Sequence, residues 1–318
     1  MEQAKTIEGV LLSGTMDLKT FYGLDFTGSG SPVRLFNPHE VSDPASIRFA
    51  VCWLPDDEAF ARYPNMEMAM SVGAGVDALL ANPSLAEETL VCRVRDPHQA
   101  DLMAGYAAHE VLHFLRSFAQ MKDHQGARAW NPLPMTPPKE TRIAVLGNGT
   151  MGAAIARALA AMGYSVAVAC RTQPEEPQAG ISYHSGTGAL DMACKGSRIA
   201  INVLPLTDET ENILNRRLFN QLEAGAWLVQ IGRGEHLHEA DFTEALDNGQ
   251  LAGATLDVFR EEPLPENHPF WDDARLRITP HIASDSTPSV VAEQIRASAV
   301  ELLQGKRPLL AIDRHQGY

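Results

Sequence analysis

The sequence predicts an α/β protein of two domains, of which the second is built on a doubly wound parallel sheet. Three observations predict this fold class. The chain has 318 residues, and single hydrophobic cores stop growing at about 250 to 300 residues, so two cores are expected. From residue 142 to residue 281, strand-like and helix-like segments alternate, which is typical of parallel sheets covered by helices. A glycine-rich turn joins the first of these strands to its helix.

Composition and charge limit the class of protein and of partner. Hydrophobic residues make up 45% of the chain and charged residues 21%, which is typical of a globular protein. A formal net charge of −14 argues against nucleic acid or an anionic membrane as the main partner. Because no signal-peptide-like segment or apolar run of about 18 residues is visible, we expect a soluble, cytoplasmic protein.

The four cysteines show no CxxC spacing. Three of them, Cys52, Cys92 and Cys170, lie in strand-like apolar runs, and the fourth is Cys194. We interpret them as free core thiols rather than metal ligands, and no metal site is predicted.

The first hundred residues read as a small α/β domain whose strands are mostly buried. The predicted strands are residues 10–12, 33–36, 47–54, 66–72 and 90–92. After the fourth strand, Gly73 and Gly75 would let backbone N–H groups approach a ligand closely, which would suit a carboxylate. A tight strand-to-helix turn without a ligand explains the same glycines.

A long helix is predicted over residues 101–125, followed by an extended arm. The arm, residues 130–138, contains too many prolines for a helix or a strand. Trp130 in this arm is either a dimer contact or a side chain packed on its own domain.

The second domain opens with a dinucleotide-binding pattern. A strand at 142–146 leads into Gly147-Asn148-Gly149-Thr150-Met151-Gly152, and a helix at 153–162 and a strand at 165–170 follow. A GxGxxG turn in this context lets a pyrophosphate approach a helix N-terminus, where free N–H groups favour negative charge. A turn with a structural role alone is the less favoured interpretation.

The end of the 165–170 strand points to the coenzyme. NAD sites usually place an acidic residue there, about 20 residues after the turn, whereas this chain has Arg171-Thr172. A guanidinium and a hydroxyl suit a 2′-phosphate, so NADP(H) is predicted over NAD(H). Because Glu175 and Glu176 lie close behind, the alternative that Arg171 is only solvated and contacts no phosphate stays open.

The remaining elements continue the alternation. The predicted strands are 198–204, 227–231, 252–258 and 276–279, and the predicted helices are 208–222, 239–247 and 288–303. The last helix could cross back to the first domain.

Polar side chains follow the last three of these strands. Arg233 comes after the first, Asp257 ends the second with Glu262 close behind, and His281 follows the third. If the strands are parallel neighbours, these groups gather at one sheet edge, where open α/β sheets bind ligands. Each residue alone has an ordinary structural explanation, but together they predict an active site.

Three segments carry a family resemblance: Gly232-Arg233-Gly234, Leu256-Asp257-Val258-Phe259-Arg260-Glu261-Glu262-Pro263-Leu264-Pro265 and Thr279-Pro280-His281-Ile282-Ala283. Together they closely resemble the D-isomer-specific 2-hydroxyacid dehydrogenases. Within that family, the glyoxylate/hydroxypyruvate reductase A branch is the most similar, through these further motifs: Gly73-Ala74-Gly75-Val76-Asp77, Val111-Leu112-His113-Phe114, Trp130-Asn131-Pro132-Leu133-Pro134 and Ile312-Asp313-Arg314 with Gly317-Tyr318.

The resemblance implies a domain organisation. A flavodoxin-like substrate-binding domain would comprise residues 1–101, completed by 286–318. A Rossmann NAD(P)-binding domain would comprise residues 102–285, with a cleft between the two domains and a homodimeric assembly.

The resemblance also implies residue roles. Arg233 would hold the carboxylate and carbonyl oxygen of a 2-keto acid. His281 would donate the proton, with Glu262 on its other ring nitrogen. Asp257 would meet the nicotinamide carboxamide. Pro205 would also contact the coenzyme, the amides around Ala74 and Gly75 would bind the substrate carboxylate, and Trp53 would wall a pocket for short chains.

These roles predict NADPH-dependent reduction of glyoxylate to glycolate and of hydroxypyruvate to D-glycerate. A 2-hydroxyacid dehydrogenase of broader specificity is the nearest alternative. A nucleotide-sensing homologue without turnover is an alternative of a different class, and the retention of Arg233, Glu262 and His281 argues against it.

Overall fold

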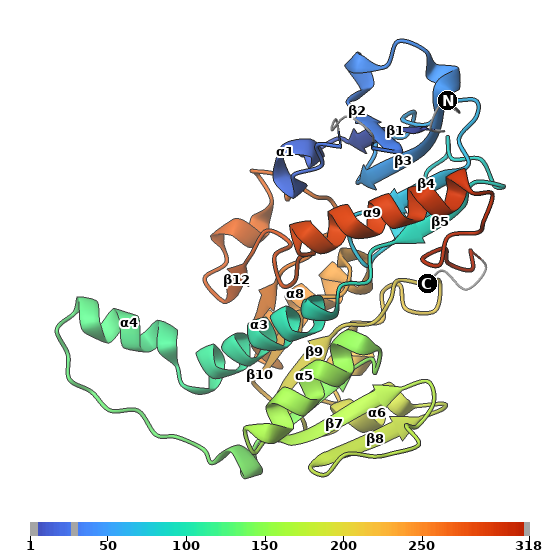
Figure 1. Cartoon of the computed structure of the whole chain (residues 1–318). Helices are drawn as coiled ribbons and strands as arrows, with labels where there is room; N and C mark the ends of the chain where they lie inside the picture. The colour runs from blue at the N-terminus through green and yellow to red at the C-terminus, as the bar shows by residue number, and fades with distance from the viewer. Residues whose placement is uncertain (1–5, 27–30, 315–318) are drawn as a thin grey trace. The chain divides into compact units, whose positions relative to one another are not determined.

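A computed structural model of the chain describes residues 6–26 and 31–314 (Figure 1). The chain divides into two compact units, one comprising Met1–His98 with Asp285–Tyr318 and the other Gln99–Ser284. The boundaries expected from the sequence, after residues 101 and 285, lie within a few residues of these. Gly317 and Tyr318, which belong to one of the quoted motifs, lie outside the described residues.

The first unit contains a five-stranded parallel sheet. Its strands are β1 (Ile7–Ser13), β2 (Val33–Phe36), β3 (Ile47–Trp53), β4 (Met68–Ser71) and β5 (Leu90–Arg93). They lie in the order β2-β1-β3-β4-β5, which is the flavodoxin-like order. All four neighbouring pairs are parallel, as in the flavodoxin-like domain that the family resemblance implies.

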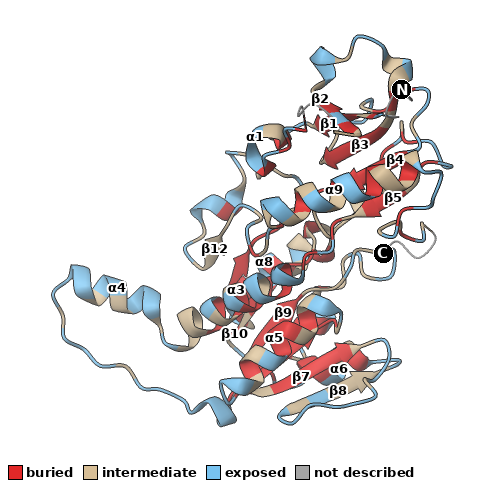
Figure 2. Cartoon of the chain, in the orientation of Figure 1, coloured by how far each residue is buried: buried red, intermediate tan, exposed pale blue. Residues whose placement is uncertain are grey.

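The helices of the first unit pack on a buried sheet. They are α1 (Leu18–Tyr22), α2 (Asp77–Leu80) and α9 (Pro288–Leu303), with short 3₁₀ turns η1 (Pro38–Glu40) and η2 (Pro44–Ser46). The bounds of α9 are those predicted. Its residues Val291, Ile295 and Ala299 are fully buried in one cluster with Phe49 and Met70 of the sheet. Figure 2 shows this division on α9, with buried residues on one side and exposed residues on the other.

The second unit contains a seven-stranded parallel sheet. Its strands are β6 (Arg142–Leu146), β7 (Ser165–Cys170), β8 (Ile181–Ser185), β9 (Ile199–Asn202), β10 (Ala226–Gln230), β11 (Leu251–Leu256) and β12 (Leu276–Ile278). The order is β12-β11-β10-β9-β6-β7-β8, so the winding reverses between β9 and β6. That reversal is where doubly wound sheets place their ligands. The doubly wound parallel sheet that the sequence predicts is confirmed.

The helices of the second unit are α3 (Pro97–Leu115), α4 (Phe118–Gly126), α5 (Thr150–Ala161), α6 (Ala189–Cys194), α7 (Arg216–Phe219) and α8 (Glu239–Asp247), with 3₁₀ turns η3 (Pro138–Glu140), η4 (Gly234–His236) and η5 (Pro269–Asp272). The prediction of one helix over 101–125 is wrong in one respect, because the segment forms two helices, α3 and α4. Ser117 between them has φ 51°, and a left-handed residue cannot continue a right-handed helix.

The predicted helix over 208–222 is also wrong. Only Arg216–Phe219 is helical, and Asn212 is left-handed with φ 54°. Instead of coiling, the chain at Leu214 forms a parallel bridge with Leu237. Backbone pairing with the 236–238 segment therefore replaces the first half of the expected helix. Strand β8 and helix α6 were not predicted at all.

The arm after α4 is exposed. Trp130 is 98% exposed, so packing of this side chain on its own unit is excluded as an explanation. No residue of α4 is buried. The apolar side chains of Phe118, Trp130 and Met135 are therefore exposed to solvent in a single chain.

The cysteines are free, as predicted, and three of them are buried. Burial raises the pKa of the Cys92 thiol and of the Cys194 thiol to about 12, so both stay protonated at neutral pH. Within the described ranges, no three His, Cys, Asp or Glu side chains are grouped to hold a metal ion. No helix in those ranges combines the length and apolar character that crossing a bilayer requires.

Candidate active site

The site residues of the second unit lie at one edge of its sheet. Strand β10 pairs in parallel with β11, and β11 pairs in parallel with β12. This confirms that the three strands preceding Arg233, Asp257 and His281 are parallel neighbours. Because the carboxyl ends of parallel neighbours share one edge, the three residues follow adjacent strands at that edge.

The predicted nucleotide residues continue along the same edge. Pro205 follows β9, the glycine turn follows β6, and Arg171 follows β7. In sheet order from β12 to β7, the edge carries six features. They are the His281 imidazole, the Asp257 carboxylate, the Arg233 guanidinium, the Pro205 loop, the glycine turn and the Arg171 guanidinium. This order runs across the point where the winding reverses.

His281 is paired with Glu262. Its Nδ1 lies 2.8 Å from Glu262 Oε2, and the other carboxylate oxygen, Oε1, accepts a hydrogen bond from the Phe259 N–H at 2.9 Å. Both side chains are about three-quarters buried, at 25% and 22% exposed. A carboxylate held in this way accepts the Nδ1 proton and leaves Nε2 as the nitrogen that can exchange a proton with a ligand.

The turn that presents His281 is clamped by Asp257. His281 has φ 54°, a left-handed conformation that costs a non-glycine residue about 1 to 3 kcal/mol. The buried Asp257 carboxylate accepts hydrogen bonds from Thr279 Oγ1 (2.6 Å), Ile282 N (2.9 Å) and Ala283 N (2.9 Å). The backbone oxygen of Asp257 accepts a hydrogen bond from His281 N at 2.9 Å. These bonds hold the strained turn, while the predicted contact of Asp257 with a nicotinamide stays a prediction.

The loop that carries Arg233 packs tightly against the loop that carries Glu262. A Cβ placed on Gly234 would lie 1.9 Å from the carbonyl carbon of Phe259, so a side chain is excluded there. The Arg233 guanidinium donates from Nη1 to the Gly232 carbonyl at 2.8 Å. The backbone oxygen of Arg233 accepts a hydrogen bond from Gln230 Nε2 at 2.8 Å. The guanidinium thus projects from a backbone that is fixed on both sides.

The glycine turn fits a pyrophosphate. A Cβ on Gly152 would lie 2.1 Å from the Gly147 carbonyl oxygen, so only glycine allows α5 to start this close to β6. Gly149 is the exposed N-cap of α5, and a Cβ added there would meet no atom within 4 Å. The first N–H groups of a twelve-residue helix therefore face an open approach.

The residues expected to recognise the rest of the coenzyme are accessible. Arg171 and Thr172 are both exposed just beyond the last residue of β7. Asn148 and Met151 of the turn are partly exposed. These positions are compatible with a bound nucleotide.

Trp53, Ala74 and Gly75 belong to the first unit, where they gather at the carboxyl ends of β3 and β4. Gly73 packs on the indole of Trp53, since a Cβ on this glycine would lie 3.1 Å from Cζ3. The Gly73 carbonyl accepts from Val94 N at 3.1 Å, and the Ala74 carbonyl accepts from Arg93 Nη1 at 3.2 Å.

This anchoring orients the two amides. The C=O and N–H groups of a trans peptide point in opposite directions, so the Ala74 and Gly75 N–H groups are directed away from the end of β5. Neither N–H donates a hydrogen bond to another described residue. A pair of neighbouring amides of this kind is a suitable anion site.

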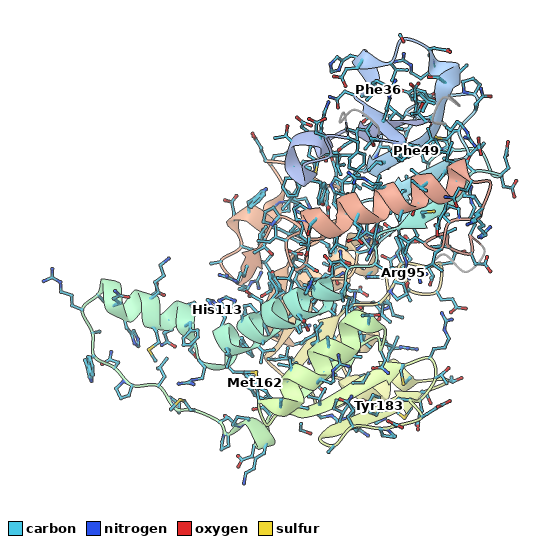
Figure 3. The ribbon with its side chains drawn as sticks, viewed as in Figure 1. Phe36, Phe49, Arg95, His113, Met162 and Tyr183 are labelled. Atoms are coloured by element: carbon cyan, nitrogen blue, oxygen red, sulfur yellow. The ribbon has the colours of Figure 1, made fainter. Side chains whose placement is uncertain are left out.

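Arg93, which the sequence did not single out as a primary candidate, lies beside the Ala74–Gly75 loop and donates to it. Burial, with Arg95 as the second cause, lowers the pKa of the Arg93 guanidinium, and its buried Nε has no hydrogen-bond partner among the described residues. Arg95, two residues further on, is exposed (Figure 3). The signal in the sequence was a charged residue that ends a buried strand beside a glycine loop.

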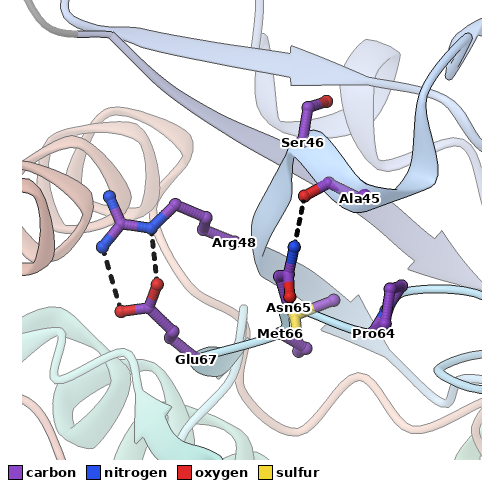
Figure 4. A pocket seen from close by; sticks show the side chains of 7 residues that line it. All are labelled: Ala45, Ser46, Arg48, Pro64, Asn65, Met66 and Glu67. Carbon is purple, nitrogen blue, oxygen red and sulfur yellow. Dashed lines mark hydrogen bonds and ion pairs between the residues drawn. The ribbon is translucent and has the colours of Figure 1, made fainter.

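A surface hollow elsewhere in the first unit does not compete with this site. Figure 4 shows it between the segments that lead into β3 and β4, at the amino ends of these strands. Its charged side chains, Arg48 and Glu67, satisfy each other through hydrogen bonds of 2.5 and 3.0 Å. The two charges of the hollow therefore compensate each other, and the hollow lies at the edge opposite to the one that open α/β sheets use.

Comparisons with known proteins agree with this arrangement. A family model described as "D-isomer specific 2-hydroxyacid dehydrogenase, NAD binding domain" matches residues 108–283. The chain is 36% identical over 291 residues to a glyoxylate/hydroxypyruvate reductase A of Serratia proteamaculans (strain 568), covering 90% of this chain and 91% of that protein.

Solved structures are similar over nearly the whole chain. The D-isomer specific 2-hydroxyacid dehydrogenase of Xanthobacter autotrophicus Py2 in complex with NADPH and MES is 33% identical with a TM-score of 0.85, covering 98% of this chain and 100% of that one. The NADPH-dependent glyoxylate/hydroxypyruvate reductase of Sinorhizobium meliloti in complex with NADP and sulfate is 26% identical with a TM-score of 0.87, covering 98% and 100%. From the sheet-edge geometry, the matching family model and these relatives, we conclude that the chain belongs to the NAD(P)-dependent D-isomer specific 2-hydroxyacid dehydrogenase family.

Proposed function

We propose that this protein reduces short 2-keto acids, converting glyoxylate to glycolate and hydroxypyruvate to D-glycerate, with NADPH as the reductant. The observation that carries the proposal is the Glu262–His281 pair, placed on the same sheet edge as Arg233 and the glycine turn. The relatives named for glyoxylate and hydroxypyruvate reduction support the choice of substrate.

Arg233 is the group we assign to the keto acid. Its planar guanidinium can bind a carboxylate oxygen and the adjacent carbonyl oxygen together. As the carbonyl carbon is reduced, negative charge grows on its oxygen, and a fixed cation stabilises that charge more than it stabilises the ground state. The hydrogen bonds to the Arg233 backbone supply the fixed position.

His281 is the group we assign to the proton. Its Nδ1 is held by Glu262, so Nε2 donates to the new alkoxide when the substrate is reduced. After donation the neutral imidazole keeps its Nδ1 proton in the bond to the carboxylate. We therefore expect reduction to need the protonated imidazole and oxidation to need the neutral one.

Residues 147–152 and Arg171 are the groups we assign to the coenzyme. The turn and the N-terminus of α5 would hold the pyrophosphate, Pro205 would contact the nicotinamide half, and Asp257 is proposed to meet the carboxamide. When bound, the reduced nicotinamide supplies the hydride. In the first unit, the Ala74 and Gly75 amides would bind the substrate carboxylate, and Trp53 would restrict the chain length.

A steady-state assay tests the proposal. NADPH oxidation would be followed with glyoxylate, hydroxypyruvate, pyruvate and longer 2-keto acids. We expect the highest kcat/KM for glyoxylate and hydroxypyruvate. Equal use of long and short acids would indicate a dehydrogenase of broader specificity. Tight NADPH binding without turnover of any acid would indicate a nucleotide-sensing homologue.

Arg171 is predicted to set the preference for NADPH. A hydrogen bond to a charged group contributes about 1.5 to 3 kcal/mol, so Arg171→Asp should lower kcat/KM for NADPH by roughly 10- to 100-fold and leave NADH less affected. The measurement is kcat/KM for both coenzymes in both forms. Arg157→Asp is the matched control, because it makes the same charge change at another exposed arginine. An unmodified protein that uses both coenzymes equally would contradict the assignment.

A homodimer is the proposed assembly, and the exposed arm supports it. Trp130 and Met135 are 98% and 66% exposed, which is unusual for large apolar side chains of an isolated domain. We expect the protein to have the mass of a dimer in light scattering, and Trp130→Ser with Met135→Ser to raise the dissociation constant at least roughly tenfold, or about 1.4 kcal/mol. Leu309→Ser, at a 78% exposed leucine outside the arm, is the control and should leave the mass unchanged. A monomeric wild-type protein at micromolar concentration would refute the proposal.

A further inference from the structure

His236 is a fully buried polar residue close to the site, and no role in binding or catalysis has been assigned to it so far. It ends η4, three residues after Arg233, and is 0% exposed. Asn202 at the end of β9 and Gln230 at the end of β10 are also 0% exposed. The three side chains form one hydrogen-bonded cluster beneath the Arg233 loop.

The contacts of this cluster are specific. Asn202 Nδ2 lies 2.8 Å from Gln230 Oε1 and 2.9 Å from His236 Nδ1. Arg233 N donates to His236 Nδ1 at 3.1 Å, and His236 Nε2 lies 3.2 Å from the Pro205 carbonyl oxygen. Gln230 completes the set by donating from Nε2 to the Arg233 carbonyl at 2.8 Å.

These partners determine the tautomer of the imidazole. A backbone N–H can only donate, so His236 Nδ1 must be the unprotonated nitrogen that accepts from Arg233. A carbonyl oxygen can only accept, so Nε2 must carry the proton that goes to Pro205. The neutral ring with its proton on Nε2 satisfies both backbone groups, and the other neutral tautomer satisfies neither.

We propose that His236 is a positioning residue that joins the substrate arginine to the coenzyme loop. One ring nitrogen fixes the backbone from which the Arg233 guanidinium projects, and the other fixes the carbonyl of Pro205 in the loop after β9. The inference rests on the proposed function, since it takes the roles of Arg233 and Pro205 from there. We therefore expect one side chain, His236, to determine both the position of Arg233 at the keto acid and the position of the Pro205 loop at the coenzyme.

Two substitutions separate the two links. In His236→Asn, the side-chain oxygen can take the place of Nδ1 and accept from Arg233 N, but the bond to Pro205 is lost. In His236→Gln, the longer amide can place its nitrogen near Nε2 and donate to Pro205, but no acceptor remains for Arg233 N. Each variant therefore keeps one link and removes the other.

We expect the two variants to show opposite defects. His236→Gln should lower kcat for glyoxylate roughly three- to tenfold with little change in the Kd of NADPH, because one hydrogen bond typically contributes about that factor. His236→Asn should weaken NADPH binding by a similar factor and change kcat less. Thermal denaturation checks that both variants fold, and His236→Phe, which removes both links, should show both defects.

The test separates this inference from the proposed function. NADPH binding is measured by fluorescence titration without keto acid, and the tautomer is read from the ¹⁵N chemical shifts of the imidazole in the full-length protein. If the wild-type protein reduces no keto acid, the proposed function fails, while the Asn variant and the tautomer still test the link to Pro205. A ring protonated at Nδ1, equal defects in kcat and Kd for both variants, or no defect in either would overturn the inference.

Discussion

Replacing Arg233 by alanine is expected to lower kcat for glyoxylate by roughly 10²- to 10³-fold without unfolding the protein. The loss should be large because the guanidinium is assigned to the oxygen on which negative charge grows during reduction. Folding should persist because the bonds that hold this loop come from the Arg233 backbone, which donates to His236 and accepts from Gln230. The measurements are kcat and KM for glyoxylate, with the thermal midpoint of each form.

Arg233→Lys is the informative companion variant. Lysine keeps the positive charge but cannot bind two oxygens in one plane, so we expect it to recover little of the loss. Arg95→Ala, at an exposed arginine of the first unit, is the control and should change kcat little. Near-normal turnover by folded Arg233→Ala would move the carbonyl contact elsewhere, and Arg93 with its buried Nε would be the next residue to replace.

The fold was predictable from the sequence where local pattern and tertiary structure agree. Strand β6, the glycine turn and strand β7 each have a strong local signal, and their spacing alone indicated a parallel βαβ unit. The polar residues after β10, β11 and β12 predicted a shared edge before any pairing was known. Helix α9 was predictable to the residue because Pro288 begins it and its apolar positions repeat at helical spacing.

The errors lie where tertiary contacts override local pattern. Residues 208–222 have helical spacing, yet Leu214 N donates to the His236 carbonyl and His238 N donates to the Leu214 carbonyl. These bonds connect segments that are far apart in the chain, so no local pattern predicts them. Strand β8 was missed because its residues are only partly buried and show no apolar run.

The candidate site was predicted by residue type but not by its supporting bonds. Arg233, Glu262 and His281 were candidates because a guanidinium, a carboxylate and an imidazole suit keto-acid chemistry. That Asp257 clamps the turn of His281, or that His236 joins Arg233 N to Pro205, depends on hydrogen bonds between different loops. Such bonds leave no periodic signal in a single sequence.

The second large effect is expected at Glu262. The carboxylate accepts two hydrogen bonds, from His281 Nδ1 and from Phe259 N. Glutamine has one accepting oxygen, so Glu262→Gln must lose one of these bonds or turn its NH₂ group towards Nδ1. In the second case Nδ1 becomes the acceptor, and the imidazole holds its single proton on Nε2. Donating that proton would leave an imidazolate, which is an unfavourable product.

Glu262→Gln should therefore lower kcat for reduction by about 10²-fold, and His281→Gln by roughly 10²- to 10⁴-fold, the usual range for a general acid. Coenzyme affinity should change little, because the glycine turn and Arg171 follow other strands of the sheet. Because reduction needs the protonated imidazole and oxidation needs the neutral one, the two directions should show opposite pH dependence in the wild-type protein. His281→Gln should remove this pH dependence in both directions.

Glu261→Gln is the matched control for this prediction, because it removes the same charge from the adjacent, exposed carboxylate. It should leave kcat and the pH profile close to those of the wild type. The decisive measurement is the pH dependence of kcat/KM for glyoxylate at saturating NADPH in the wild type and the three variants. If Glu261→Gln lowers kcat as much as Glu262→Gln does, net charge near the site explains the loss, and the proton is not controlled by the bond between Glu262 and His281.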